Sequence, residues 1–255
     1  MTLEQRRAAL EAELGEPITL DGLSADFKIF QRRNGHRHSI DDLLTAWYAL
    51  EQLPAPTRSL DLGTGIGTVG LLMVSAVPAL ALTCIEAQDI SYRFLTENIA
   101  ANHVGERVRA LHGDLRELAL GETFPLITGS PPYFDPRAGI VPADSQKAHA
   151  RFELRGDVAD YAHAAKAHLA DDGTFVFCFP HAQAERAVAA MHTTGFSIVK
   201  RREVVPREGL TPLFGLYACR PGTHREVVES AFTVRDAVGE HTETYRAVRR
   251  RFGWV

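Results

Sequence analysis

A glycine-rich segment that begins with an acid carries the strongest chemical signal in this 255-residue chain. It reads Asp61-Leu62-Gly63-Thr64-Gly65-Ile66-Gly67 and joins a strand-like run to a helix-like run. Glycines permit a tight turn and let a ligand approach the backbone closely. A helix that begins there offers free N–H groups and positive dipole character. The segment therefore predicts a site for an anionic group, either a pyrophosphate or the carboxylate of an amino acid.

Three carboxylates favour the second of these ligands, although the glycines at 65, 67 and 70 also fit a dinucleotide fingerprint. Asp61 would repel a pyrophosphate, whereas it suits the cationic amine of a methionine. Glu86 ends the next strand-like run, where it can accept bonds from both hydroxyls of a ribose. Asp114 ends the run after that, where it can accept a bond from an adenine amino group. Together these residues predict S-adenosylmethionine as the cofactor.

A second segment, Ser130-Pro131-Pro132-Tyr133, follows the fourth strand-like run, where parallel sheets bind ligands. Two prolines stiffen the loop and leave carbonyl acceptors exposed. An amine on an aromatic ring or an acyl carbon is a poor nucleophile because its lone pair is delocalised. Ser130 and the Pro131 carbonyl can each accept one N–H of such an amine, and Tyr133 can stack on a flat acceptor. The segment predicts methyl transfer to a planar nitrogen, mostly by alignment.

The elements that must position these segments alternate between strand and helix from residue 58 to about residue 180. We expect strands at 58–63, 82–87, 107–114, 124–132 and 173–179, and helices at 67–77, 89–103 and 157–170. Such alternation predicts βαβ units and a parallel sheet covered on both faces. A helix at 182–195 and strands at 196–206 and 211–220 follow, and these two strands should pair antiparallel at the sheet edge. The fold class is α/β with a mainly parallel, seven-stranded sheet.

The remaining chain flanks this core. Residues 1–57 should form an N-terminal extension of helix, extended segment and helix that packs on the core of residues 58–222. Within it, Asn34-Gly35 suggests a hairpin turn, and Ser39 is a plausible cap for the second helix. Residues 223–255 form a partly helical, arginine-rich C-terminal tail.

The composition is that of a soluble globular protein, with 45% hydrophobic and 24% charged residues. It has no apolar run long enough for a membrane span, and its charged N-terminus is unlike a signal peptide. Three cysteines lie in apolar runs, which indicates buried thiols rather than disulfides or a metal site. These features favour a cytoplasmic monomer or weak dimer without metal. The histidines, among them His149, are scattered and suggest no role.

The net charge of −4 and the pI of about 6.3 count against a dedicated nucleic-acid binder. Basic residues are nevertheless concentrated at 32–38, 200–202 and 246–251. Any one of these runs is more simply explained as solvated surface.

The motifs, in their order along the chain, resemble those of class I amino-methyltransferases, whose fold is Rossmann-like. Residues 35–47 (GHRHSIDDLLTAW) look like the GxRFSxDxxLLA segment of tRNA adenine-N6 methyltransferases, which modify adenine 37 of valine tRNA. Residues 148–153 (AHARFE) look like their ARHE segment. Ser130 stands where the family commonly has Asn, Phe152 where it has His, and His38 where it has Phe. The resemblance spans roughly residues 28–220.

Motifs and resemblance together assign the site. We expect the cofactor to contact Arg37, His38, Asp61, Gly63, Thr64, Gly65, Gly67, Glu86, Ala87, Asp114, Leu115 and Ser130. Catalysis should depend on Ser130, Pro131, Pro132 and Tyr133. The substrate should contact Tyr133, Phe134 and Arg151, of which Arg151 follows from the resemblance alone.

Four functions fit the residues to different degrees. The first is an RNA base methyltransferase acting on adenine N6 in tRNA, with the basic runs holding phosphates. The second keeps the chemistry but methylates a protein amide or a small-molecule amine. A dinucleotide-dependent oxidoreductase would need a substrate domain for which the chain has little room. A non-catalytic binding module is disfavoured by the intact Ser-Pro-Pro-Tyr segment.

Overall fold

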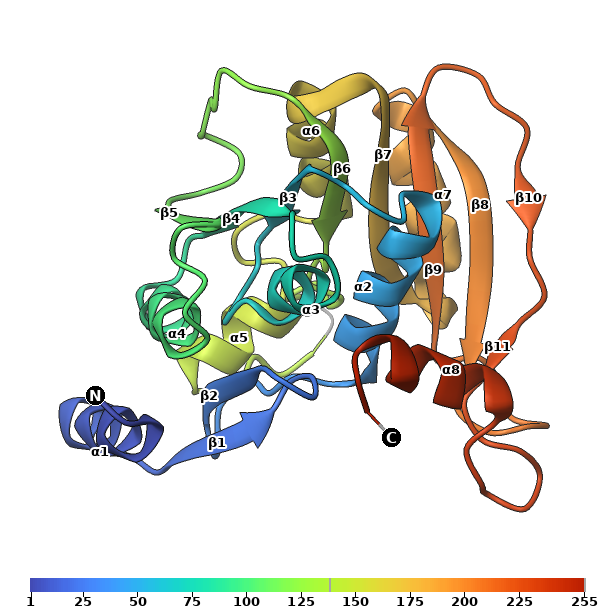
Figure 1. The fold of residues 1–255 in the computed structure, drawn as a ribbon. Coiled ribbons are helices and arrows are strands. Elements are labelled where there is room, and N and C mark those ends of the chain that lie inside the picture. Colours follow the sequence, from blue (N-terminus) through green and yellow to red (C-terminus); the bar gives the residue numbers. More distant parts are fainter. Residues whose placement is uncertain (138, 255) are drawn as a thin grey trace.

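A central sheet organises the computed structural model, which describes residues 1–137 and 139–254 (Figure 1). Its seven main strands run in the order β8-β9-β7-β6-β3-β4-β5. They are β3 (Arg58–Leu62), β4 (Ala81–Glu86), β5 (Val108–His112), β6 (Phe124–Gly129), β7 (Leu169–Pro180), β8 (Phe196–Val205) and β9 (Phe214–Pro221). The strands β5, β4, β3, β6 and β7 are parallel to one another, and β9 is antiparallel to both β7 and β8. The predicted mainly parallel sheet with an antiparallel pair is confirmed.

Helices cover both faces of the sheet, as predicted. One face carries α2 (Ile40–Gln52), α3 (Thr68–Ala76) and α4 (Asp89–Ala101), and the other carries α6 (Val158–His168) and α7 (Ala184–Thr193). The side chains of β7 alternate between these layers, since Phe175, Phe177 and Phe179 belong to the α6–α7 core and Val176 and Cys178 to the α2–α3 core. Successive side chains of a β-strand point to opposite faces of the sheet, which gives this alternation. Because both faces are buried, the sequence of β7 from Phe175 to Phe179 is continuously apolar.

The N-terminal segment forms α1 (Leu3–Leu14) and an antiparallel hairpin of β1 (Ile18–Gly22) and β2 (Lys28–Arg32). The prediction of a hairpin turn at Asn34-Gly35 is wrong for the hairpin that β1 and β2 form. Its turn lies at residues 23–27, where the Leu23 N–H donates to the Phe27 carbonyl over 2.9 Å. Asn34-Gly35 instead closes a turn after β2, and the chain then enters α2 without a further strand that could pair.

Residues after 222 extend the sheet instead of leaving it as a simple tail. The two short strands β10 (Val227–Val228) and β11 (Phe232–Thr233) both pair parallel with β8, so β8 has partners on its outer side. The chain then returns as α8 (Glu243–Arg251) beside the N-terminal hairpin and α2 (Figure 1).

Two further short helices lie in connections of the chain. Helix α5 (Ser145–Arg151), between β6 and α6, was absent from the sequence prediction, and the 3₁₀ turn η1 (His181–Gln183) follows β7. None of the described helices is long and apolar enough to cross a membrane.

Candidate active site

The glycine loop joins β3 to α3 and takes a shape that favours glycine. Gly63, Gly65 and Gly67 have positive φ angles of 57°, 60° and 95°. At Gly63 a Cβ would lie 2.0 Å from the Tyr161 hydroxyl of α6, whereas at Gly65 it would meet no atom within 4 Å. The loop is thus packed tightly on one side and open at Gly65, as close approach of a ligand to the backbone requires.

Asp61 is buried beneath this loop and organises it. Its Oδ1 accepts a bond from the Thr128 hydroxyl over 2.7 Å, and its Oδ2 accepts from the Thr64 hydroxyl and from the Gly70 N–H. Burial raises the pKa of Asp61, although all three donors oppose the shift. The carboxylate reaches the cavity wall, but its bonds give it a part in loop structure that the sequence did not reveal.

Glu86 ends β4 and turns its carboxylate toward the glycine loop. Its Oε2 accepts the Gly65 N–H over 2.8 Å, and its Oε1 accepts the Gln88 N–H over 2.7 Å. The residue is only 5% exposed, and this burial raises the pKa of Glu86 to about 7, although hydrogen bonds from the backbone oppose the shift. Such an acceptor, at the cavity wall, has the chemistry needed to receive hydroxyl groups of a ribose.

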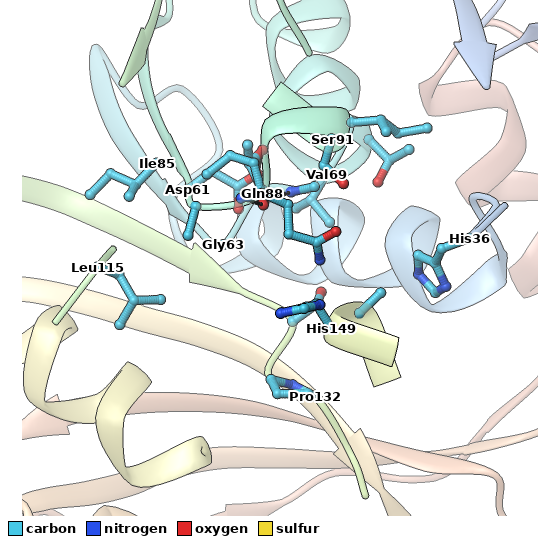
Figure 2. Close-up of a pocket in the computed structure, with 18 of the residues that line it drawn as sticks. His36, Asp61, Gly63, Val69, Ile85, Gln88, Ser91, Leu115, Pro132 and His149 are labelled. Atoms are coloured by element: carbon cyan, nitrogen blue, oxygen red, sulfur yellow. Dashed lines mark hydrogen bonds between the residues drawn. The ribbon is translucent and has the colours of Figure 1, made fainter. Parts of the chain in front are cut away.

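Asp114 lies at the next strand end along the sheet and is already oriented by a cation. The Arg116 side chain donates to it twice, from Nε over 2.9 Å and from Nη2 over 2.6 Å, and the Arg116 backbone N–H donates over 3.0 Å. These hydrogen bonds lower the pKa of Asp114, so the carboxylate stays ionised. Ile85 and Leu115 lie on one side of the cavity and supply apolar wall (Figure 2).

These residues and the proline loop surround one cavity (Figure 2). The expected residues that line it are Arg37, His38, Asp61, Gly63, Thr64, Gly65, Glu86, Ala87, Asp114, Leu115, Ser130 and Pro132. Gly67, Pro131, Tyr133, Phe134 and Arg151 lie outside this lining. Open backbone at Gly65, a buried acceptor at Glu86 and apolar wall at Leu115 fit the amino-acid, ribose and adenine parts of S-adenosylmethionine.

Tyr133 is held from behind the cavity by its hydroxyl. The hydroxyl donates to Asp41 Oδ2 over 3.0 Å and lies 3.3 Å from Cys178 Sγ, while the ring meets Phe179 edge-on at 5.8 Å. Burial raises the pKa of Tyr133 well above its usual value, so the hydroxyl stays protonated. The Cys178 thiol in turn lies 3.7 Å from the Ser130 oxygen. Asp41, from the start of α2, is therefore part of the support of the Ser-Pro-Pro-Tyr loop.

Phe134 and Arg151 stabilise the outer end of that loop. The Arg151 carbonyl accepts the N–H groups of Tyr133 and Phe134 over 3.0 and 2.9 Å. Phe134 is 48% exposed and contacts Phe152 with ring centroids 5.5 Å apart. The structure thus places the backbone carbonyl of Arg151 in contact with the loop residues.

Helix α5 supplies lining residues that sequence reasoning missed. Gln146 is buried, and its Oε1 accepts the His36 N–H over 3.2 Å, while His149 faces Gln88 from the other side of the cavity (Figure 2). Asp42 also lines the cavity, and burial together with Asp41 raises the pKa of Asp42 to about 8. The one signal that pointed here was the segment at 148–153, which begins inside α5. Among the described residues no group of three acids, histidines or cysteines could hold a metal.

The strand order and the position of the cavity define a class I methyltransferase fold. Residues 45–192 match the model of the methyltransferase small domain family, which is more than half of the chain. The chain therefore belongs to this family and is a methyltransferase that uses S-adenosylmethionine as its methyl donor.

Individual relatives and solved structures agree with this class. The tRNA1(Val) (adenine(37)-N6)-methyltransferase of Actinobacillus pleuropneumoniae is 24% identical over 205 residues, which cover 80% of this chain and 85% of that protein. The enzyme of the same name from Mannheimia succiniciproducens is 25% identical over 215 residues, covering 82% and 84%. A predicted O-methyltransferase from Agrobacterium tumefaciens has a TM-score of 0.66 at 16% identity, covering 85% of this chain and 98% of its own. That structural likeness shows the fold alone.

Proposed function

We propose that this methyltransferase methylates the exocyclic N6 of an adenine in tRNA. The observation that carries the proposal is the position of Ser130 and Pro132 on the wall of the same cavity as Glu86. The Ser-Pro-Pro-Tyr loop, which should accept the N–H groups of the target amine, therefore lies next to the cofactor site. The names of the similar proteins from Actinobacillus and Mannheimia support adenine in tRNA as the acceptor.

The cofactor's place follows from the cavity wall. Glu86 accepts the ribose hydroxyls, Leu115 and Ile85 flank the adenine, and Asp114 accepts its amino group. The glycine loop from Gly63 to Gly67 holds the methionine end, with Asp61 beneath it. Arg37 and His38 close the opposite wall, where Arg37 is itself bound to Asp21 over 3.0 Å.

The Ser-Pro-Pro-Tyr loop prepares the acceptor. S-adenosylmethionine, when bound, supplies an electrophilic methyl group. Ser130 Oγ and the Pro131 carbonyl each accept one N–H of the target amine, which localises its lone pair on nitrogen. Tyr133 stacks on the base with an orientation held by Asp41 and Cys178. The nitrogen forms a bond to the methyl carbon as the bond between that carbon and sulfur breaks, and the sulfur leaves as a neutral thioether. The nitrogen then loses one proton to water, so that no strong base is required.

Basic side chains near the cavity favour a polyanionic substrate. His36, Arg37, His149 and Arg155 line the cavity, and Lys147 and Arg151 belong to the same helix as His149. Arg155, Lys147 and Arg151 thus supply cations at or near the cavity on a chain whose net charge is −4. This arrangement suits an RNA loop with unstacked bases, where phosphate contacts give affinity. We place this activity in the cytoplasm, where tRNA is found, and propose that the chain acts as a monomer or weak dimer.

The test is methyl transfer from labelled S-adenosylmethionine to total RNA, to protein extract and to small metabolites. We expect label in RNA, recovered as N6-methyladenosine after nuclease digestion. Tyr133→Ala should abolish it, whereas Asp171→Asn, at an exposed carboxylate in β7, should not. Label confined to protein or metabolites would contradict the RNA substrate and would support the amide or amine alternative. A steep loss of RNA methylation with added salt is a further expectation.

A further inference from the structure

A second cavity, of about 300 Å³, lies next to the cofactor site and shares only His38 with its described lining. It is bounded by the end of β1, the start of α2, helix α3 and helix α8. Its walls include His38, Leu43, Leu72, Tyr245, Arg249 and Trp254. The volume is at the lower end of the range for ligand pockets, and an apolar floor with aromatic and cationic walls is typical of a recognition site.

The C-terminal segment closes this cavity in a fixed position. A Cβ at Gly22 would lie 2.6 Å from the Trp254 ring, so the indole packs directly on the hairpin. The Ala25 N–H donates to the Phe252 carbonyl over 2.9 Å. Arg251 forms an ion pair with Glu51 of α2 over 2.6 Å. The wall formed by α8 is therefore anchored to both the hairpin and α2, as a preformed site requires.

The charges around the cavity suit an anion. Arg250 and Arg251 have carboxylate partners, but Arg249 has none within ion-pair distance in the part of the chain that the structure describes. No acidic side chain is found among the described residues of the lining. Nearby, burial and then Arg235, Arg249 and Arg246 lower the pKa of His241, which indicates a positive local potential.

His38 lines both the second cavity and the first, so the two cavities lie next to each other at this residue. A substrate that reaches the cofactor site is thus adjacent to Arg249, Tyr245 and Trp254. Aromatic rings beside an arginine are the means by which proteins bind single-stranded nucleic acid, since bases stack on the rings and the cation meets a phosphate.

We infer that this second cavity binds the nucleotide next to the target adenine in a single-stranded RNA loop. The inference rests on the proposed RNA substrate and adds to it a subsite formed by the C-terminal segment. Trp254 and Tyr245 contact the neighbouring base, and Arg249 contacts its phosphate. The chain therefore recognises RNA through residues far from the methyl-transfer loop in sequence.

The test compares Arg249→Ala and Trp254→Ala with Arg246→Ala, a matched arginine of α8 that does not line the cavity. With a short RNA hairpin whose loop contains an unpaired adenosine, we expect KM to rise at least about tenfold in the first two variants. Arg246→Ala should stay near the wild type. The affinity for S-adenosylmethionine, measured by calorimetry, should be unchanged in all three. Trp254→Phe should recover part of the loss because it keeps an aromatic face.

A direct binding measurement keeps the two proposals separable. Trp47→Phe leaves Trp254 as the single tryptophan, and its fluorescence should be quenched by the same RNA hairpin but not by a fully paired duplex. RNA methylation with an unchanged KM in Arg249→Ala and Trp254→Ala would overturn the subsite and leave the proposed function standing. Unquenched Trp254 at RNA concentrations above KM would also overturn it. Absence of any RNA methylation by the wild type would instead contradict the proposed function.

Discussion

The Glu86 carboxylate accepts the backbone N–H of Gly65 over 2.8 Å, and this bond joins the end of β4 to the most open point of the glycine loop. Burial raises the pKa of this carboxyl group to about 7. The residue that should receive the ribose hydroxyls therefore titrates near neutral pH.

Cofactor affinity should depend on pH through Glu86. Ribose hydroxyls donate hydrogen bonds, so they favour the ionised carboxylate, and protonation below pH 7 removes this preference. We expect the Kd for S-adenosylmethionine to be constant above this pKa and to rise by up to tenfold per pH unit below it. Calorimetry across this range measures the effect.

Glu86→Gln should bind the cofactor more weakly and with a flatter pH profile. Asp42 titrates near 8 and lines the same cavity, so Asp42→Asn is the control that separates the two groups. If the Kd of Glu86→Gln depended on pH as that of the wild type does, another group would be responsible for the pH dependence.

Without cofactor, the same shift affects folding in the opposite direction. Because the folded pKa of Glu86 lies above its ordinary value of 4.5, its contribution to stability is present below pH 4.5 and is lost as the pH rises toward 7. Urea unfolding of wild type and Glu86→Gln over this range should show the wild type losing stability relative to the variant. If the free energies of unfolding of the two proteins changed with pH in the same way, the raised pKa of Glu86 would be contradicted.

Asp61→Ala should abolish measurable cofactor binding. The change removes the acceptor for the Thr64 and Thr128 hydroxyls and for the Gly70 N–H, so the glycine loop loses its internal support. Calorimetry with S-adenosylmethionine measures it, and thermal melting confirms that the variant is folded. An affinity equal to that of the wild type would refute the assignment of Asp61 to this site.

Asn98 should contribute strongly to stability, because it joins the N-terminal hairpin to the glycine loop. It is fully buried, accepts the Phe30 N–H over 2.7 Å and donates to the carbonyls of Phe30 and Ile66. Asn98→Leu leaves these buried groups without partners and should lower the free energy of unfolding by about 3 kcal/mol. Asn102→Leu is the matched control, since Asn102 makes similar bonds to Lys28 but at a more exposed position. Equal losses in urea unfolding would contradict the role of burial.

Asp41 should act as a positioning residue through the Tyr133 hydroxyl. Asp41→Ala is expected to lower kcat for methyl transfer about tenfold while the Kd for the cofactor stays constant, because the ring loses one of its two polar contacts. Tyr133→Phe should have a similar effect, since it removes the same bond but keeps the ring. A double-mutant cycle decides the matter: the second change should add little to the first. Fully additive effects would show that Asp41 acts by another route.

The sequence alone determined the parts of the protein that depend on local geometry. Glycines at 63, 65 and 67 fit positive φ angles, and the repeated change between strand and helix patterns implies a parallel sheet covered on both faces. The acids at residues 61, 86 and 114 follow successive strands, and the carboxyl ends of parallel strands meet at one edge. Much of the lining of the cavity that we assign to the cofactor could therefore be predicted from short stretches of chain, each read on its own.

Only the tertiary structure decided how distant segments complete the site. The Tyr133 hydroxyl meets an acid 92 residues away, and α5 is a helix of seven residues whose place depends on contacts made by Gln146. The return of α8 to the hairpin likewise needs the whole sheet between them. Contacts between residues this far apart cannot be predicted from local sequence patterns, because burial and packing are properties of the folded chain. The second cavity exists only where four such segments meet.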